Sequence, residues 1–396
     1  MTDAYVLHTV RTPRGKAKEG GGLASVAPVG LLSALLDALV ERTGLDPVAV
    51  DDVIIGCAGQ VGDQGGGVAR TAVLAAGWPS RVPGLTISRY CASGIDAVAL
   101  AAALVRSGQA EQVVAGGVES VSRVPLFADR GPLWCDAELV ERIGSVHMGI
   151  AADVVATEEG YEREELDAYG LRSQRRAARA WQDGLFAASL LPVGGLDHDE
   201  HVRTDVSEAS MAALEPAFAG LGAAGQDAIA LRHLPGLGDV RHLHTRATSP
   251  SVADGAGLVL VGSAAAAERL GLGVRARVVA SASAGGHPVR MLVAGQDAVE
   301  IALERAGLRP SDLDVVEFAE AFAALCLKIQ REFKLDDDVL NPNGGTIAMG
   351  HAFGATGAIL TAGCVDELHR GGGRYGVAAV SGAAGSGAAL VLERVP

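Results

Sequence analysis

The chain has 396 residues, of which 49% are hydrophobic and only 4% aromatic, and its formal net charge at pH 7 is −14. A chain of this length buries a large aliphatic core and is expected to form more than one packed unit. The acidic balance excludes the clustered basic face of a nucleic-acid-binding protein. The five cysteines are widely spaced and form no CxxC pair, which indicates free thiols in a reducing compartment, so we expect a cytoplasmic protein.

An amphipathic helix, a glycine at its end, a proline turn and a short apolar strand occur in this order twice. The first copy covers residues 31–55, with Gly44 after its helix, and the second covers residues 298–318, with Gly307 after its helix. This internal repeat predicts two related α/β halves.

Each half also contains a turn, a second helix and a second strand. We expect a helix and a strand over 92–116 after a turn at Cys91, and another pair over 354–380 after a turn at His351. Strands that alternate with helices predict parallel or mixed sheets covered on both faces. Functional groups are then expected at helix N-termini and strand ends.

The segment between the two halves has a different composition. Residues 119–244 are richer in charge, and we interpret them as an inserted subdomain of helices and loops. The predicted domains are therefore an N-terminal half over 1–118 and 245–270, the inserted subdomain over 119–244, and a C-terminal half over 271–396.

Other patterns in the chain do not predict a site. Residues 375–392 are uncharged over about the length of a membrane span, but their glycines and serines favour two buried strands joined by a glycine turn, so we expect no membrane segment. The histidine pairs His198/His201 and His242/His244 lack a second ligand pair at a recognised spacing, and no metal site is predicted.

Cys91 is the first candidate catalytic residue. A lone cysteine in a core strand is usually a small buried hydrophobe. Cys91 instead stands between a turn and the start of a helix, where free amides and the helix dipole favour a thiolate and lower the thiol pKa from about 8.5. Ser93 and Gly94 after it allow another backbone to approach closely. We therefore expect Cys91 to be a reactive nucleophile.

His351 is the second candidate catalytic residue. It lies in a glycine-bracketed loop over 350–357, where the glycines indicate tight geometry. A helix start disfavours the protonated imidazole, so His351 is expected to be neutral and able to act as a base near pH 7. A thiol beside an imidazole is the minimum equipment for acyl transfer through a covalent thioester.

Several motifs occur together in an order that makes the family assignment specific. They are Arg11-Thr12-Pro13, Cys91-Ala92-Ser93-Gly94, Ala115-Gly116-Gly117-Val118-Glu119-Ser120, His147-Met148-Gly149, Asp254-Gly255-Ala256, Glu320-Ala321-Phe322-Ala323, and Asn343-Gly344-Gly345 followed by Gly350-His351. With these motifs the chain resembles the thiolase family over nearly its whole length.

The resemblance implies a fold, an activity and an assembly. The fold is an α/β five-layered αβαβα arrangement of two similar halves, with Cys91 and His351 at their interface and the inserted subdomain binding coenzyme A. The activity is thiolase-type acyl transfer, as in fatty acid metabolism, between acyl-CoA or 3-ketoacyl-CoA and coenzyme A or acetyl-CoA. Coenzyme A is then a substrate and product, with no tightly bound cofactor. Relatives of this kind assemble as homodimers or homotetramers.

The resemblance also assigns roles to individual residues. Cys91 is the nucleophile acylated by an acyl-CoA, and His351 activates it and helps to form an oxyanion hole. Met148, Phe218 and Ser249 stand at positions that contact coenzyme A in relatives, and Phe322 lines the acyl pocket.

The chain departs from the family pattern at four positions. Ser381 stands where the family has its second catalytic cysteine, which moves the proton at the carbon alpha to the thioester, and we count Ser381 among the catalytic candidates. Ala319 replaces an asparagine that holds an oxyanion-hole water. Ala352 replaces the proline after the histidine, and Ser88 replaces an asparagine near the nucleophile.

These departures leave alternative functions open. One is altered acyl transfer, thioester hydrolysis or retro-aldol cleavage without Claisen chemistry. Another is a non-catalytic acyl-CoA-binding subunit, although such a subunit needs neither a nucleophilic thiol nor a base. The segment over 219–243 reads as a loop rich in glycine and alanine, longer than in short-chain biosynthetic relatives, which suggests a pocket for a bulkier acyl group.

Overall fold

The computed structural model describes residues 2–396, and ten strands in this range form one hydrogen-bonded sheet. The strands are β1 (Tyr5–Arg11), β2 (Gly15–Lys16), β3 (Asp52–Gly56), β4 (Leu85–Ile87), β5 (Gln112–Glu119), β6 (Ala253–Gly262), β7 (Ala276–Gly285), β8 (Val315–Phe318), β9 (Tyr375–Gly382) and β10 (Ser386–Arg394). Their order is β4-β3-β5-β6-β1-β7-β10-β9-β8, and β2 pairs with β6. The two halves of the sheet meet at β1 and β7, which pair at only two register positions.

The helices lie between and around the two halves of the sheet. They are α1 (Pro28–Thr43), α2 (Val68–Ala75), α3 (Ser93–Arg106), α4 (Pro132–Cys135), α5 (Ala137–Ile143), α6 (Met148–Glu158), α7 (Arg163–Gln182), α8 (Glu208–Ala212), α9 (Ala219–Leu221), α10 (Asp227–His233), α11 (Ala264–Leu270), α12 (Ala294–Ala306), α13 (Ala323–Phe333), α14 (Thr346–Met349) and α15 (Phe353–Gly371).

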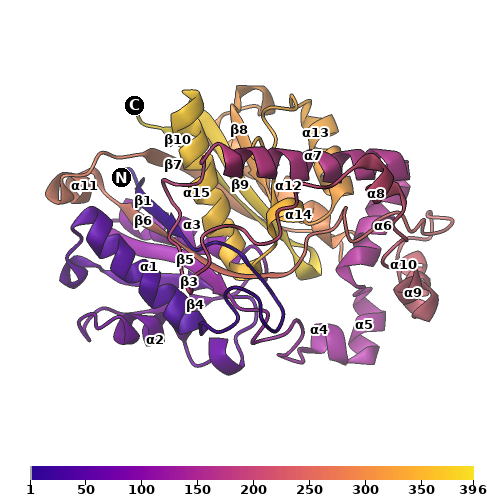
Figure 1. Cartoon of the computed structure of the whole chain (residues 1–396), viewed down its shortest axis with the longest axis horizontal. Helices are drawn as coiled ribbons and strands as arrows, with labels where there is room; N and C mark the ends of the chain where they lie inside the picture. The colour runs from indigo at the N-terminus through magenta and orange to yellow at the C-terminus, as the bar shows by residue number, and fades with distance from the viewer. Residues whose placement is uncertain (1) are drawn as a thin grey trace.

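Five layers result from the packing of these elements, as the sequence predicted. Helices α3 and α15 contact each other, and α15 contacts β5 and β6 of the first half as well as β8 and β9 of the second (Figure 1). Helices α1 and α2 pack on the first half of the sheet, and α12 packs on β7, β9 and β10. The turns before α3 and α15 therefore lie in the middle of the molecule, between the two halves.

The repeat found in the sequence is confirmed as a structural repeat. Gly44 directly follows α1 and Gly307 directly follows α12, each with a φ of 67°, a left-handed conformation that glycine adopts without strain. A short 3-10 turn beginning at Pro47 or Pro310 follows each glycine. The next strand is β3 in the first copy and β8 in the second, and each pairs in parallel, β3 with β5 and β8 with β9.

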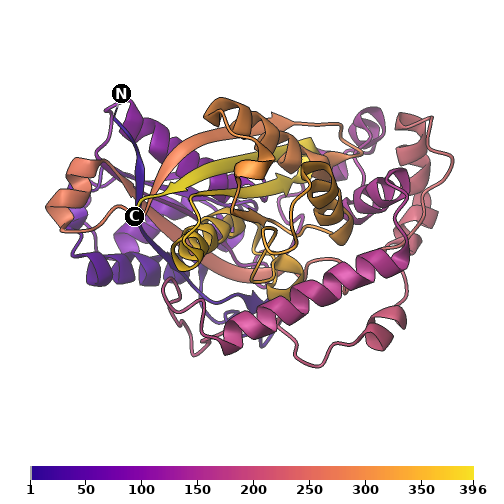
Figure 2. The same cartoon turned by 90° about the horizontal axis from the view of Figure 1, so that it is seen from above.

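Helices α4 to α10 occupy the chain between β5 and β6, and α7 runs along the outside of the molecule (Figure 2). The expectation of a loop over 219–243 was wrong in part, because α9, a π-helical turn (Gly222–Gln226) and α10 occupy residues 219–233. Alanine favours helix, and Asp227 in the first turn of α10 and Arg232 near its end suit the helix dipole.

The uncharged segment over 375–392 forms β9 and β10, which pair antiparallel across a tight turn, as predicted. Across residues 2–396, we find no helix with the length and apolar character that a membrane crossing requires.

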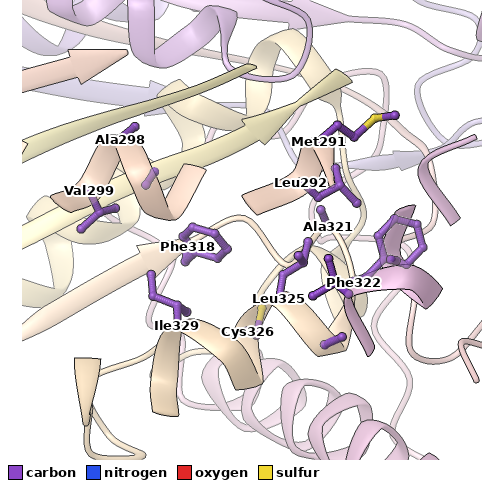
Figure 3. Packing of buried hydrophobic residues seen from close by; sticks show 14 of the residues in the cluster. Met291, Leu292, Ala298, Val299, Phe318, Ala321, Phe322, Leu325, Cys326 and Ile329 are labelled. Atoms are coloured by element: carbon purple, nitrogen blue, oxygen red, sulfur yellow. The ribbon is translucent and has the colours of Figure 1, made fainter. Parts of the chain in front are cut away.

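A large buried cluster packs the second half of the sheet against α6, α12 and α13. Phe318 and Ile329 lie deep in this cluster, while Leu292, Ala321 and Phe322 lie together at one end of it (Figure 3). These last three residues also line the cavity described below. One wall of the cavity is therefore the edge of a close-packed core, which holds its shape.

Candidate active site

Cys91 lies in the short turn that joins β4 to α3, as the sequence predicted. The residue before it, Tyr90, has a φ of 49°, which is strained for a residue with a side chain. The Ser93 hydroxyl accepts a hydrogen bond from the Arg89 backbone amide at 2.8 Å and holds the turn closed. The turn therefore presents the Cys91 side chain at the N-terminal end of α3.

Glycines let α3 and α15 approach each other closely at the ends that carry the two catalytic candidates. A Cβ on Gly94 would lie 2.7 Å from the Gly354 carbonyl oxygen, and a Cβ on Gly357 would lie 2.3 Å from the Ile95 amide nitrogen. Both neighbours are backbone atoms that cannot move aside. Gly94 thus allows the close backbone approach that the sequence predicted, and this contact brings the turns at Cys91 and His351 together.

Glu119, at the end of β5, ties the two halves together beside the site. Its carboxylate accepts hydrogen bonds from the backbone amides of Ala58 at 2.9 Å, Gly59 at 3.1 Å and Gly354 at 3.0 Å. The last of these amides belongs to the first turn of α15. Sequence reasoning quoted Glu119 only as part of a motif, although an acid at the end of an otherwise apolar buried strand is a signal of such a role.

His351 is held in place by both its backbone and its ring. Its amide donates to the Ser251 carbonyl oxygen at 2.8 Å, and its Nδ1 lies 2.8 Å from the Thr356 hydroxyl oxygen. The Phe353 ring packs edge-on against the imidazole, with ring centroids 5.1 Å apart. Because Thr356 engages Nδ1, the other ring nitrogen, Nε2, is the one left for proton transfer.

The pKa values of the Cys91 thiol and the His351 imidazole indicate that both groups are neutral before a substrate binds. Partial burial of the side chain and the nearby Glu119 carboxylate raise the pKa of the Cys91 thiol to about 12, so the expected lowering of this pKa was wrong. Burial and the Arg14 guanidinium lower the pKa of the His351 imidazole to about 3, which agrees with a neutral base. The thiol proton therefore has to move during attack on a substrate, and a base beside the thiol becomes essential.

Cys91, His351 and Ser381 line one cavity of about 230 Å³. Met148, Phe218, Ser249 and Phe322 line the same cavity, so the fold brings together every site residue proposed from the sequence. Within residues 2–396, the hydrogen bond of the His351 ring is to Thr356 and not to the Cys91 sulfur. Such contacts often form only when a substrate is bound.

Ser381 lies at the end of β9 with its hydroxyl tied to the backbone. The hydroxyl donates to the Leu292 carbonyl oxygen at 2.6 Å and accepts from the Gly295 amide at 3.2 Å. Its proton is therefore held by a carbonyl group in the 3-10 turn (Met291–Val293) that precedes α12. Ala319 is fully buried and is not among the residues that line the cavity.

The candidate contacts for coenzyme A form a second wall of the cavity. Met148 is the first residue of α6, and the Phe218 ring covers this helix end so closely that a Cβ on Gly149 would lie 2.3 Å from a ring carbon. The rings of Phe218 and Phe322 meet edge-on with centroids 5.7 Å apart. Ser249 is buried and donates its hydroxyl hydrogen to the Thr245 carbonyl oxygen at 2.8 Å.

The remaining cysteines and histidines lie outside this arrangement. Cys57, Cys326 and Cys364 are buried, whereas Cys135 is exposed, so a reagent reaches Cys135 as well as the half-buried Cys91. His242 bridges the carboxylates of Asp153 and Asp227, at 3.0 Å each. Among residues 2–396 the structure holds no group of three or more possible metal ligands.

Comparisons with known proteins identify the family and support the fold. A family model described as "Thiolase, N-terminal domain" matches residues 4–226, and one described as "Thiolase, C-terminal domain" matches residues 272–394. The chain is 36% identical to a 3-oxoadipyl-CoA/3-oxo-5,6-dehydrosuberyl-CoA thiolase of Escherichia coli, covering 100% of both chains. It is also 36% identical to a steroid 3-ketoacyl-CoA thiolase of Mycobacterium tuberculosis, covering 100% of this chain and 95% of the relative. The crystal structure of the Bacillus anthracis acetyl-CoA acetyltransferase matches with a TM-score of 0.85 at 32% identity, covering 100% of this chain and 99% of that one.

Proposed function

Because the chain belongs to the thiolase family, we propose that its thiolase-type acyl transfer between CoA thioesters passes through an acyl group carried on Cys91. The observation that carries this assignment is the single cavity between the two halves, where Cys91, His351 and the candidate coenzyme A contacts all converge. The names of the relatives favour this function over hydrolysis, retro-aldol cleavage or a non-catalytic binding subunit.

In the first half reaction, the Cys91 sulfur attacks the 3-keto carbon of a 3-ketoacyl-CoA while Nε2 of His351 takes the thiol proton. A carbon–sulfur bond forms, and the bond between carbons 2 and 3 of the substrate then breaks. The electron pair of that bond leaves with the acetyl-CoA fragment as an enolate. The enolate takes a proton at carbon 2, and the acyl group stays on Cys91.

The source of this last proton distinguishes the chain from its family. The Ser381 hydroxyl is a far weaker acid than a thiol, and its proton is bound to the Leu292 carbonyl oxygen. The imidazolium formed at His351 is therefore the acid that returns the proton to carbon 2. In the second half reaction, the thiol of coenzyme A attacks the acyl group, His351 takes its proton, and that proton returns to the departing Cys91 sulfur.

A second cavity supports the placement of coenzyme A. It has a volume of about 180 Å³, and the cationic residues Arg203 and Arg246 line it, together with one acid, Asp205. The loop that carries Arg246 continues to Ser249 in the cavity with Cys91. Guanidinium groups bind phosphates well. The cavity with Arg203 and Arg246 therefore suits the phosphates of a coenzyme A molecule whose pantetheine arm passes Ser249 and Met148. Sequence reasoning missed both arginines, because they lie in a segment where charge is common.

The domain limits, the assembly and the compartment belong to the same proposal. The inserted subdomain over 119–244 carries Met148 and Phe218 and would bind coenzyme A, while the halves over 1–118 with 245–270 and over 271–396 supply Cys91 and His351. A homodimer or homotetramer in the cytoplasm fits the family and the free thiols. Coenzyme A acts as a substrate and product, with no tightly bound cofactor.

Intact-protein mass spectrometry tests this function directly. Wild-type protein incubated with a panel of acyl-CoAs should gain the mass of one acyl group, and peptide mapping should place the group on Cys91. The Cys91→Ala variant should gain no such mass, although Cys135 remains accessible in both proteins. An acyl group found on Cys135, or retained in Cys91→Ala, would contradict the assignment.

A further inference from the structure

Aromatic side chains gather around the cavity that contains Cys91, although they make up only 4% of the chain. At one end, the Phe127 and Trp134 rings lie with centroids 4.7 Å apart, and the Tyr90 ring meets Trp134 edge-on at 6.1 Å. Phe322 lines the same cavity, beside Phe218, which is also a candidate contact for coenzyme A. Aromatic rings attract one another in offset and edge-to-face arrangements, so these walls favour a flat apolar guest.

No Lys, Arg, Asp or Glu lines this cavity in the part of the chain that the structure describes, residues 2–396. Two imidazoles line it, His147 and His351, and burial lowers the pKa of both, with Arg14 adding to the effect at His351, so both are neutral near pH 7. A carboxylate at the far end of an acyl chain would find no cation there. Its burial without a partner is strongly unfavourable.

The surroundings beyond the aromatic end are also unsuited to an anion. A smaller cavity of about 50 Å³ adjoins it and shares Tyr90, Phe127 and Trp134 as lining residues. Among residues 2–396, the charged residues that line this smaller cavity are both acids, Glu119 and Asp129. This space therefore offers a terminal carboxylate two acids and no cation.

The space is sufficient for a ring. An apolar cavity of about 150 Å³ holds a benzene molecule, and the cavity at Cys91 measures about 230 Å³ before the adjoining space is added. The volume is therefore large enough for a ring, and the adjoining space of about 50 Å³ extends the cavity at Tyr90, Phe127 and Trp134.

We propose that the acyl group carried by Cys91 is uncharged and bears an aromatic or alicyclic ring, which sits against Trp134 and Phe127. This inference rests on the proposed acyl transfer, because it names the substrate class of the same site. Straight acyl chains of similar length bind more weakly than ring-bearing ones, and chains with a terminal carboxylate bind most weakly.

The test measures binding in a protein that cannot react. Calorimetry on Cys91→Ala compares 3-phenylpropanoyl-CoA, hexanoyl-CoA and adipoyl-CoA, the last two being matched in chain length. The ring-bearing thioester should bind at least about tenfold more tightly than adipoyl-CoA, and hexanoyl-CoA should lie between them. Equal or tighter binding of adipoyl-CoA, or equal binding of hexanoyl-CoA and 3-phenylpropanoyl-CoA, overturns the proposal.

A second substitution, added to Cys91→Ala, shows which side chain causes the preference for the ring-bearing thioester over adipoyl-CoA. Trp134→Ala should reduce it to less than about threefold, and Trp134→Phe should retain most of it. Trp181→Ala is a matched control, because Trp181 is also half-buried but packs on Phe186 and His198, away from the cavity. A preference that survives in Trp134→Ala overturns the proposal. Acylation plays no part in these measurements, so their failure and a failure of the proposed function are separate results.

Discussion

The substitution Ser381→Cys tests where the chain departs from its family. In the wild type, the Ser381 hydroxyl is far too weak an acid to exchange protons with a carbon near pH 7, whereas a thiol with a pKa of about 8.5 is well matched to this task. A matched general acid or base contributes about 10² to 10⁴ in rate, or about 3 to 5 kcal/mol of barrier. We expect Ser381→Cys to raise the thiolysis of acetoacetyl-CoA by at least about tenfold.

The hydrogen bonds of Ser381 determine how much the substitution lowers the free energy of unfolding. The Ser381 hydroxyl makes two neutral hydrogen bonds, to Leu292 and from Gly295, and a thiol is a weak partner in both. At about 1 kcal/mol each, their loss lowers the free energy of unfolding by about 2 kcal/mol. Ser381→Ala is the matched control, because it loses the same two bonds and provides no acid.

The assay follows thiolysis of acetoacetyl-CoA at saturating coenzyme A for the three proteins, with urea unfolding measured in parallel. We expect Ser381→Cys to be faster than the wild type and Ser381→Ala to show no gain, while both variants lose stability. Wild-type thiolysis as fast as that of Ser381→Cys would refute the reasoning, since it would show that His351 alone supplies the proton as efficiently as His351 together with a second thiol.

Three further predictions concern the packing and charges that hold the site. Gly94→Ala should reduce acylation of Cys91 at least about 100-fold, because the new Cβ would meet the Gly354 carbonyl oxygen at 2.7 Å, whereas Gly273→Ala, with nothing within 4 Å, should acylate normally in the same mass assay. Asp199→Asn should lower the free energy of unfolding by about 3 to 5 kcal/mol in urea titrations, because it leaves the two guanidinium groups that face Asp199, at 2.9 Å each, buried and unpaired. Burial alone would raise the pKa of the Asp199 carboxyl, but those guanidinium groups hold it well below its ordinary value. The difference in the free energy of unfolding between wild type and Asp199→Asn should therefore be largest above about pH 4 and become smaller as the pH falls further.

Much of the fold follows from local sequence patterns. The glycines that end α1 and α12, the proline turns after them and the strands β3 and β8 are short-range features, and the structure has them where the sequence predicted them. The positions of Cys91 and His351 in turns before helices follow in the same way. Such signals depend on a few neighbouring residues, so contacts with distant parts of the chain do not change them.

The features that the sequence did not predict depend on contacts between distant segments. The pKa of Cys91 is raised because folding buries the thiol and brings Glu119 from another strand beside it, which outweighs the helix start. The aromatic wall joins Tyr90 to Phe127 and Trp134, and the last two lie in a segment that its charges mark as a surface region. The hydrogen bonds of Ser381 reach a helix nearly ninety residues earlier in the chain.

The most direct test of the catalytic pair is the rate at which Cys91 is acylated with and without the His351 imidazole. The wild type and His351→Ala are mixed with excess acyl-CoA at pH 7, and the acylated fraction is followed by rapid quench and mass spectrometry. Because the Cys91 thiol is protonated at rest, removal of the base should slow acylation by about 10² to 10⁴, while coenzyme A binding measured by calorimetry changes little. Acylation of His351→Ala at the wild-type rate would contradict the account.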